Sequence, residues 1–262
     1  MIYIKTSEEI ELMRAAADLV SRTLGEVARW VTPGVTTRRL DTIAREFILD
    51  NGGKPACLGY EGFPGTLCIE VNETVVHGFP SQYVLREGDI VGCDTVAELN
   101  GFNGDSCYTF QVGEIPEQTA SFLSTVKESL YVGIEAAKAG KRVGDISNAV
   151  QRYCEQRNFS VVREMCGHGI GRDMHEEPDV PNYGRRGCGP VLRPGMCICI
   201  EPMINVGSKN IVIERNGWEC RTRDRKPSAH FEHTILITED EPEVLTTFRY
   251  IEEVRKEMGY KF

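Results

Sequence analysis

Apolar residues recur at helical spacing over the first fifty positions. After the stretch KTSEE, the spacings of 3 and 4 predict an amphipathic helix that buries Ile10, Met13, Ala17, Val20, Leu24 and Val27. Thr6 and Glu9 are the residue types of a capping box, so we expect the helix to begin there. The turn residues TPG end it, and a second helix is predicted from about Leu40 until DNGG stops it.

The second half of the chain repeats this pattern. A long helix is predicted by Phe122, Val126, Leu130, Ile134 and Ala137, and a shorter one begins near Ile146. REGDIVGCD ends at Asp94 and RPGMCICIE ends at Glu201, each with Arg, a Gly two residues later and an acid six residues after that. These correspondences indicate a diverged internal duplication, roughly 8–112 and 118–240.

The arrangement of elements in each half predicts the fold class. Both halves have two helices followed by short β-type runs, such as DIVGCDTVAEL and NGDSCYTFQVG. The economical packing is an α+β architecture with one antiparallel sheet from both halves and helices on its outer face. We expect residues 1–262 to form a single catalytic domain, with the ligand site between the halves.

Composition narrows the possible partners and the compartment. The net charge of −9 over 262 residues argues against specific nucleic-acid binding, and the basic run RTRDRK (221–226) is expected to be a solvated loop. The ten cysteines form no C-x-x-C pair and are expected to be reduced core residues. The N-terminus lacks the apolar segment of a signal peptide, and no run of 18 apolar residues is present. We therefore expect a cytoplasmic protein with no membrane segment.

A predicted hairpin places two acids on one face. Asn100-Gly101 is a strong two-residue turn signal, so Leu99 should pair with Phe102 and Asp94 should lie opposite Cys107. Asp105 would then be diagonal to Asp94 on the same face. Two such carboxylates repel each other unless they share a proton or bind cations. In the second half, Glu201 and Glu232 also stand next to apolar strands. For any one of these acids, a solvent-facing strand end is the ordinary alternative.

All five histidines stand in glycine-rich turns or near the acids: His77, His168, His175, His230 and His233. A lone histidine more often has a structural role, but five histidines in such segments indicate a catalytic or metal-binding site. HEEPDV is not a zinc-binding H-E-x-x-H helix, because Pro178 stands where the helix would continue. Two Asp, two Glu and one or two His suit two bridged divalent ions, and Mn, Fe, Co or Zn would be acceptable.

Several long motifs resemble the type I methionine aminopeptidases of bacteria. They run in order from about residue 3 to 250: CLGYEGFPGTLCIEVNETVVHGFP, GDIVGCD, GFNGDSCYTFQVG, CGHGIGRDMHEEPDVPNYG, LRPGMCICIEPMI and SAHFEHTILIT. The resemblance implies the pita-bread fold, which agrees with the duplication. It also implies a dinuclear centre held by Asp94, Asp105, His168, Glu201 and Glu232, with Asp105 and Glu232 bridging.

The same resemblance implies roles around that centre. Glu201 would shuttle a proton, and His77 and His175 would donate hydrogen bonds to the scissile amide and the developing oxygen. A small apolar methionine pocket would be lined by Cys57, Tyr60, Phe63, Cys68, His77 and Trp218. A monovalent-cation site (Na or K) is implied near Asn72, Thr74 and Ser228. The implied partners are the N-termini of nascent polypeptides and, transiently, the ribosome through RTRDRK; the implied state is a monomer.

Four positions depart from the usual pattern of that family. Glu61 stands where His is common, Met174 replaces Phe, His230 replaces Gln, and Tyr108 stands where smaller or charged residues are familiar. None of these changes removes a ligand. Two other functions compete: a proline-specific aminopeptidase or prolidase of the same fold, which usually has an extra N-terminal domain, and a metal-free relative acting as a binding or RNA-associated module, which typically loses ligands.

Overall fold

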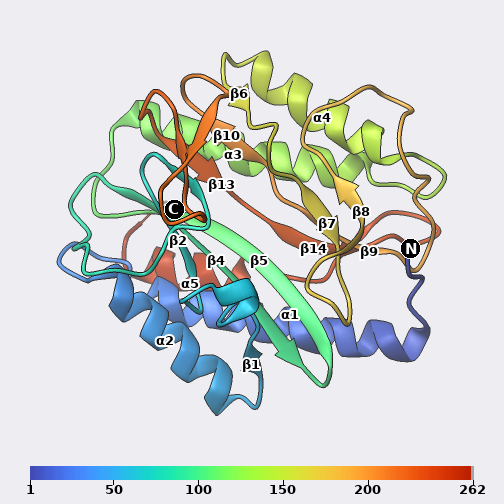
Figure 1. The fold of residues 1–262 in the computed structure, drawn as a ribbon, viewed down its shortest axis with the longest axis horizontal. Helices are drawn as coiled ribbons and strands as arrows, with labels where there is room; N and C mark the ends of the chain where they lie inside the picture. The colour runs from blue at the N-terminus through green and yellow to red at the C-terminus, as the bar shows by residue number, and fades with distance from the viewer. Residues whose placement is uncertain (261–262) are drawn as a thin grey trace.

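The computed structural model describes residues 1–260 and contains two pairs of long helices. The first pair is α1 (Ser7–Ala28) and α2 (Thr37–Asp50), and the second is α3 (Glu117–Ala136) and α4 (Val143–Glu155). A further helix, α5 (Arg249–Glu257), follows the last strand. Figure 1 shows α1, α2 and α5 along one side of the strands and α3 and α4 along the other. The predicted helices and their outer position are therefore confirmed.

The described residues form short strands that pair only in antiparallel fashion. Those of the first half are β1 (Lys54–Pro55), β2 (Cys68–Val71), β3 (Thr74–Val76), β4 (Ile90–Leu99) and β5 (Phe102–Gln111), with a 3₁₀ turn at Tyr60–Gly62. Those of the second half are β6 (Ser160–Val161), β7 (Gly167–Gly169), β8 (Glu176–Val180), β9 (Cys197–Ile200), β10 (Met203–Asn205), β11 (Ile211–Ile213), β12 (Cys220–Thr222), β13 (Ser228–His230), β14 (His233–Leu236) and β15 (Glu243–Val244).

The start and the buried face of α1 follow from its sequence. The Thr6 hydroxyl accepts a hydrogen bond from the Glu9 backbone at 3.3 Å, and the Glu9 carboxylate accepts one from the Thr6 backbone at 3.0 Å. This is the predicted capping box. The helix crosses β5 at Gly104, where a Cβ atom would lie only 2.5 Å from the Ala16 carbonyl carbon. Glycine is therefore required for the helix to lie this close to the hairpin.

The central strands divide into four hydrogen-bonded sheets. The orders are β1-β4-β2 with β5 beside β4, β13-β10-β6, β11-β12-β3, and β15-β14-β9-β7-β8. The predicted α+β class is confirmed, but the single sheet that we expected is interrupted. One of the interruptions comes at Phe231 and Glu232, which separate β13 from β14 and belong to neither ladder.

A seam of individual hydrogen bonds joins the two halves at that interruption. The Glu232 backbone donates to the Cys107 carbonyl at 3.0 Å, and the Ser106 hydroxyl donates to the Glu232 carbonyl at 2.9 Å. The Thr234 hydroxyl donates to the Asp105 carbonyl at 2.8 Å. Side-chain hydroxyls thus replace the regular ladder between β5 and the segment from β13 to β14, and acidic residues of both halves meet there.

The main hydrophobic core fills the space between the helices and the strands. It contains Leu24 of α1, Phe110 of β5, Leu130 of α3 and Ile200 of β9, all completely buried. Tyr108, one of the four departures, belongs to this core, where its ring makes edge contacts with Phe231 and Phe248. Its side chain therefore packs away from the candidate site. In residues 1–260 no helix is both long and apolar enough to cross a membrane.

Candidate metal centre and substrate pocket

The β4–β5 hairpin has the register expected from its turn. Leu99 pairs with Phe102, Asp94 lies opposite Cys107, and Asp105 lies opposite Val96. Asn100 and Gly101 both have positive φ, as a tight hairpin turn requires. Asp94 and Asp105 are therefore diagonal neighbours on one face, as predicted.

The second half brings three more predicted ligands to this face. His168 lies in β7, Glu201 follows β9 directly, and Glu232 lies between β13 and β14. His168 Nε2 is 3.6 Å from an oxygen of Asp105 and 3.6 Å from an oxygen of Glu201. The five predicted ligands therefore converge across the seam.

The imidazole of His168 is oriented toward the acids by its own backbone environment. Its Nδ1 lies 2.9 Å from the Gly169 carbonyl oxygen. A carbonyl only accepts hydrogen bonds, so the proton is on Nδ1 and the Nε2 lone pair faces the carboxylates. Gly167 and Gly169 allow this close packing, since a Cβ on either would lie 2.3 Å from a backbone oxygen of a neighbouring strand. The glycines that flank His168 thus bring its ligating nitrogen to the cluster.

Crowding and burial shift the pKa values of the cluster strongly. Burial raises the pKa of Asp94 to about 7. Burial first, and then the neighbouring carboxylates, raise the pKa values of Asp105, Glu201 and Glu232 well above their usual range. Burial lowers the pKa of His168 to about 4. Without a cation, this geometry favours protonated acids and a neutral imidazole, because burial and the neighbouring carboxylates both disfavour the charged forms.

The donor atoms at this place fit a divalent metal ion. Asp105, His168 and Glu232 present ligand atoms within 4.8 Å of one another, together with the thiol of Cys199. Within residues 1–260, one oxygen each of Asp94, Asp105 and Glu232 is buried without a hydrogen-bond partner. Buried carboxylate oxygens are normally satisfied by donors or cations. The orphaned oxygens and the neutral imidazole together suit hard or borderline divalent ions.

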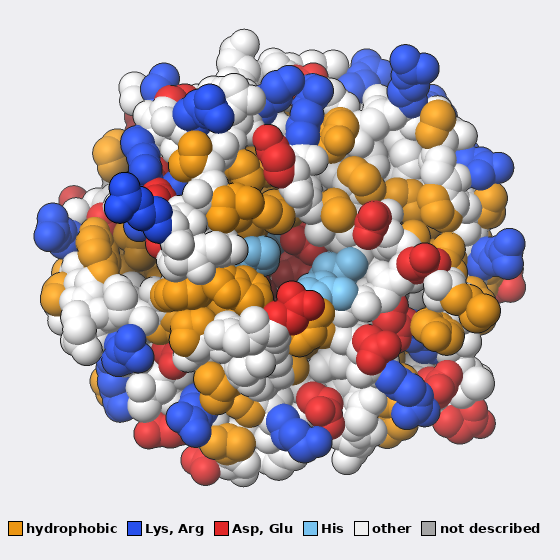
Figure 2. All heavy atoms as spheres, in the orientation of Figure 1, with side chains coloured by type: hydrophobic (Ala, Val, Ile, Leu, Met, Phe, Trp, Pro, Cys, Tyr) orange, Lys and Arg blue, Asp and Glu red, His pale blue; other side chains and the backbone are white. Residues whose placement is uncertain are grey.

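A cavity of about 570 Å³ opens above the acids. In Figure 2 it is the hollow at the centre of the molecule, with acidic side chains in its depth and histidines on either side. Every residue predicted to bind substrate lines it: Cys57, Tyr60, Phe63, Cys68, His77, His175 and Trp218. A volume of this size is typical of small-ligand and peptide-end sites.

The pocket wall is apolar and partly aromatic. The Phe63 and Trp218 rings meet edge to face with centroids 5.3 Å apart, and His77 meets Trp218 at 6.0 Å. The Tyr60 hydroxyl lies 3.1 Å from His175 Nδ1, which holds that exposed imidazole at the cavity mouth. Burial lowers the pKa of His77 to about 4 and also lowers that of His175. Both rings are therefore neutral near pH 7 and can donate N–H groups without adding positive charge.

Three of the four departures lie at this cavity. Met174 is buried in the same apolar cluster as Cys57, Phe63 and Cys68. Glu61 lines the mouth and is exposed, in a backbone conformation with φ of 47°. His230 lies at the floor, 3.7 Å from Glu201. They place a flexible thioether, a carboxylate and an imidazole where the resemblance predicts Phe, His and Gln.

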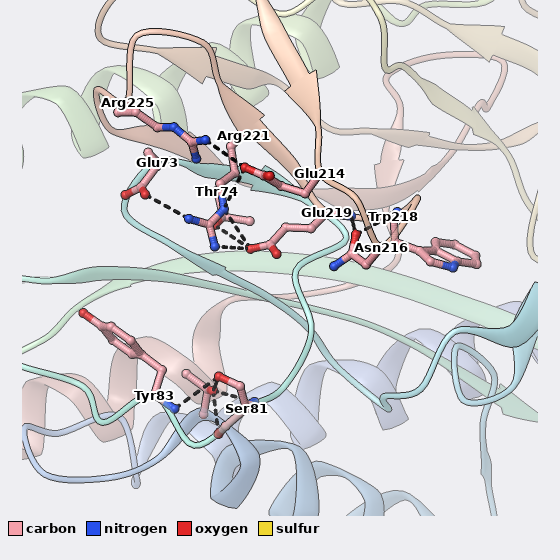
Figure 3. A network of polar contacts seen from close by, with 11 residues as sticks. Glu73, Thr74, Ser81, Tyr83, Glu214, Asn216, Trp218, Glu219, Arg221 and Arg225 are labelled. Atoms are coloured by element: carbon pink, nitrogen blue, oxygen red, sulfur yellow. Dashed lines mark hydrogen bonds and ion pairs between the residues drawn. The ribbon is translucent and has the colours of Figure 1, made fainter.

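A network of ion pairs supports the loop that carries Trp218 (Figure 3). Arg221 of β12 donates to Glu219 at 2.7 and 3.0 Å and to Glu73 at 3.2 Å. The Asn216 side chain accepts from the backbone of Trp218 at 3.1 Å and of Glu219 at 3.0 Å. The loop between β11 and β12 is thus tied to the segment before β3, which fixes Trp218 at the cavity wall.

The basic run RTRDRK is therefore not simply a solvated loop. Arg221 and Thr222 belong to β12, and Arg221 is half-buried among acids. Residues 223–226 are exposed, and Arg225 is paired with Glu214 at 2.9 Å. The single sequence run thus splits into an internal clamp and a short exposed turn.

The residues of the implied monovalent-cation site lie near this network. The Ser228 backbone donates to the Asn72 carbonyl at 2.8 Å. The Thr74 hydroxyl donates to Glu219 at 3.4 Å, and the Ser228 hydroxyl donates to the Ile204 carbonyl at 3.1 Å. The structure thus brings Asn72 and Ser228 together through their backbones, and the cation itself stays a prediction.

Sequence reasoning missed two side chains near the centre. Cys199 joins the potential ligand group of Asp105, and the buried Glu70 forms a second group with Cys107 and His230. Glu70 is an acid inside a short apolar run, which is the signal that singled out the other acids. Cys199 alternates with Cys197 along an apolar strand, and this pattern alone gives no sign of its neighbours.

The chain is similar to known proteins over nearly its whole length. Residues 11–239 match the model of metallopeptidase family M24. Methionine aminopeptidase 1 of Bacillus subtilis is 46% identical over 246 residues, which are 94% of this chain and 99% of that protein. The crystal structure of methionine aminopeptidase from Rickettsia prowazekii superposes with a TM-score of 0.93 at 40% identity, covering 94% of this chain and 100% of that one. The prolidase of Pyrococcus horikoshii superposes with a TM-score of 0.75 at 23% identity, over 93% of this chain and 63% of that one.

Proposed function

This chain belongs to metallopeptidase family M24, and we propose that it is a methionine aminopeptidase that removes the N-terminal methionine from proteins and peptides. Its fold is the pita-bread fold expected from the sequence, since it superposes on aminopeptidase and prolidase structures. The observation that carries the proposal is the convergence of four carboxylates and His168 at the floor of an apolar cavity.

The family uses divalent metal, and we propose two ions at this site. Their ligands would be the five converging residues Asp94, Asp105, His168, Glu201 and Glu232. When bound, divalent ions polarise a carbonyl oxygen and lower the pKa of a water molecule. Orphaned oxygens on three of the acids support this assignment. Mn, Fe, Co or Zn would satisfy the mixed oxygen and nitrogen donors, and a Na or K ion near Asn72, Thr74 and Ser228 is part of the proposal.

The protein's own residues would bind the peptide end and move protons. His77 and His175 are neutral near pH 7 and would donate hydrogen bonds to the peptide without adding positive charge. Glu201 would accept a proton at its carboxylate and deliver it to the leaving amine. The methionine side chain would lie among Cys57, Phe63, Cys68 and Trp218, whose soft apolar surface suits a thioether.

The two competing functions receive less support. The prolidase likeness is at 23% identity and shows the fold alone, whereas the aminopeptidase match is 46% identical over nearly all of both chains. A metal-free binding module would not need buried, mutually repelling acids. Both alternatives are therefore set aside in favour of methionine removal.

The cellular setting is proposed on weaker structural grounds. N-termini of nascent polypeptides would be the substrates, and the exposed turn 223–226 would make transient ribosome contact. We propose one catalytic domain over 1–262 with an internal duplication, because each half supplies a helix pair followed by antiparallel strands. A monomer in the cytoplasm is proposed as well; all ten cysteines in the described part of the chain are free thiols.

The decisive experiment measures free methionine released from Met-Ala-Ser by chelator-treated protein as Mn, Fe, Co or Zn is added back. We expect release to depend on metal and Ala-Pro-Gly to be a poor substrate. Glu201→Gln should lower kcat about 100-fold or more, since a general acid–base group contributes that much. Glu98→Gln, which removes a half-buried acid near the end of β4 that pairs with Lys54, is the matched control. Preference for Ala-Pro-Gly, or full activity without metal, would overturn the proposal.

A further inference from the structure

A buried acid–histidine pair lies directly behind the proposed metal centre. Glu70 of β2 is 3% exposed and His230 of β13 is 2% exposed. His230 Nδ1 lies 3.4 Å from one Glu70 oxygen and 3.5 Å from the other. Because a carboxylate accepts, the Nδ1 proton points at Glu70, and the carboxylate fixes the plane of the imidazole ring. Neither residue belongs to the proposed ligand set.

The surroundings of Glu70 are built to hold its carboxylate in this place. In the β2–β4 register, Glu70 lies opposite Gly92. A Cβ atom at Gly92 would be 2.2 Å from Glu70 Oε2, so only glycine leaves room for the carboxylate. The Cys107 thiol lies 3.7 Å from the same oxygen and donates to it. The acid is therefore enclosed by β4, β5 and β13.

The second ring nitrogen of His230 points at Glu201, the proposed catalytic acid. His230 Nε2 lies 3.7 Å from Glu201 Oε2, which is ion-pair distance but longer than a hydrogen bond. Within the described residues, Nε2 is buried and has no hydrogen-bond partner. Glu70 comes from the first half of the chain, and His230 and Glu201 come from the second. The row of three side chains thus crosses the seam and ends at the centre.

We propose that Glu70 is a positioning residue that acts through His230 to hold the Glu201 carboxylate in its working orientation. The inference rests on the proposed function and deepens it. An outer carboxylate that fixes a histidine ring is a common way to orient the groups around a metal centre, and its loss typically reduces activity or metal affinity about 10- to 100-fold. The two ring nitrogens of His230 face different acids, with Nδ1 toward Glu70 and Nε2 toward Glu201.

One other interpretation uses the same atoms. Glu70, Cys107 and His230 each present a donor within 4.8 Å of the others, so they could themselves hold an ion. The pair would then be a ligand set rather than a support for Glu201. The number of ions bound per chain distinguishes the two interpretations. If Glu70 positions Glu201, the chain binds two ions, and if Glu70, Cys107 and His230 are ligands, it binds three.

The test uses full-length Glu70→Gln and Glu70→Ala, with Glu98→Gln as the control that removes a half-buried acid of β4 outside the cavity. We measure kcat and KM for Met-Ala-Ser over a range of pH. We also measure Mn²⁺ binding by calorimetry, using protein freed of metal by a chelator. For Glu70→Ala we expect kcat to fall about 10- to 100-fold, while KM changes less than about twofold. The acidic limb of the pH profile of kcat should shift. Mn²⁺ should bind more weakly, with the same number of ions per chain. Glu70→Gln keeps the shape and an acceptor oxygen, so it should lose less, and the control should match wild type.

Two results would overturn the inference. One is a folded Glu70→Ala or Glu70→Gln protein with wild-type kcat, pH profile and Mn²⁺ affinity. The other is a third Mn²⁺ or Zn²⁺ ion per wild-type chain that Glu70→Ala loses. If Glu70→Ala does not fold, the isosteric Glu70→Gln decides. Failure of the wild type to release methionine would instead refute the proposed function, and the Mn²⁺ affinities of the variants would still test the role of Glu70.

Discussion

Replacing Asp94 by Asn should stabilise the metal-free protein while weakening its metal binding. Burial raises the pKa of Asp94 from the ordinary 3.8 to about 7. At about 1.4 kcal/mol for each tenfold change in the dissociation constant, keeping this carboxylate ionised costs the folded state about 4 kcal/mol. Asp94 is half-buried at the cavity wall, with one oxygen fully enclosed, so cavity water screens part of the charge and about 4 kcal/mol is a ceiling.

The pH dependence has a definite sign and window. Between about pH 4 and pH 7, the folded state holds a proton on Asp94 that the unfolded chain has lost, so the free energy of unfolding of wild type falls as pH rises. Asn carries no charge, so the free energy of unfolding of the variant does not fall in this way as pH rises. Its advantage should be near zero at pH 4, grow to as much as about 4 kcal/mol at pH 7, and stay constant above. The pKa values of His77 and His168, lowered to about 4, give the opposite slope, but both proteins contain these residues and the difference cancels them.

The assay is urea unfolding of both proteins in excess chelator at pH 5, 6, 7 and 8, repeated with saturating Mn²⁺. Since a ligand that binds only the folded state stabilises it by mass action, Mn²⁺ should raise the midpoint of wild type more than that of Asp94→Asn. Glu98→Gln, which removes a half-buried acid from the same strand, should show no pH-dependent gain in stability. A variant no more stable than wild type at pH 8, or a gap of equal size at pH 5, would show that burial of the ionised Asp94 carboxylate does not destabilise the folded protein.

Three further variants test the pocket and the packing. Arg221→Met should raise KM for Met-Ala-Ser several-fold with little change in kcat, because the loop of Trp218 loses its ion pairs, whereas the exposed Arg223→Met should behave as wild type. Met174→Phe should narrow the pocket and change the ratio of kcat/KM for methionine substrates to kcat/KM for norleucine substrates. A ratio that stays at the wild-type value would contradict this role of Met174. Gly104→Val should lower the free energy of unfolding in urea by about 1–3 kcal/mol or more, because its side chain overlaps the backbone of α1.

Local signals in the sequence were sufficient for the hairpin and the helices. Asn100-Gly101 fixes a two-residue turn, and that turn alone sets the register from Leu99↔Phe102 to Asp94↔Cys107. The helices follow from apolar spacing, with Thr6 and Glu9 as a start signal. These features depend on residues close together in the chain, so the sequence pattern contains all the information that they need.

Features that depend on long-range contacts could not be read in this way. The partner of Glu70 is 160 residues away, and no turn or periodicity connects it to His230. Arg221 pairs with Glu73, which is 148 residues away in the chain. The sequence pattern of RTRDRK gives no sign of this pairing and therefore predicts a solvated loop. The expected single sheet is divided into four, and at one of the breaks, Phe231 and Glu232, apolar spacing alone gives no sign that the ladder stops. The resemblance to a known family, rather than spacing, supplied the ligand roles.

The way in which the acids meet links stability to metal binding. Asp94 and Asp105 are brought together by one local turn, whereas Glu201 and Glu232 reach them only when β9 pairs with β14 and the seam with β5 closes. Closing that seam presses four carboxylates together, and this opposes folding while no cation is present. An ion that binds acids from both halves would therefore contribute its binding free energy to the docking of one half against the other. The seam has few hydrogen bonds and the halves also share one hydrophobic core, so the binding free energy of such an ion would add to the packing that already joins them.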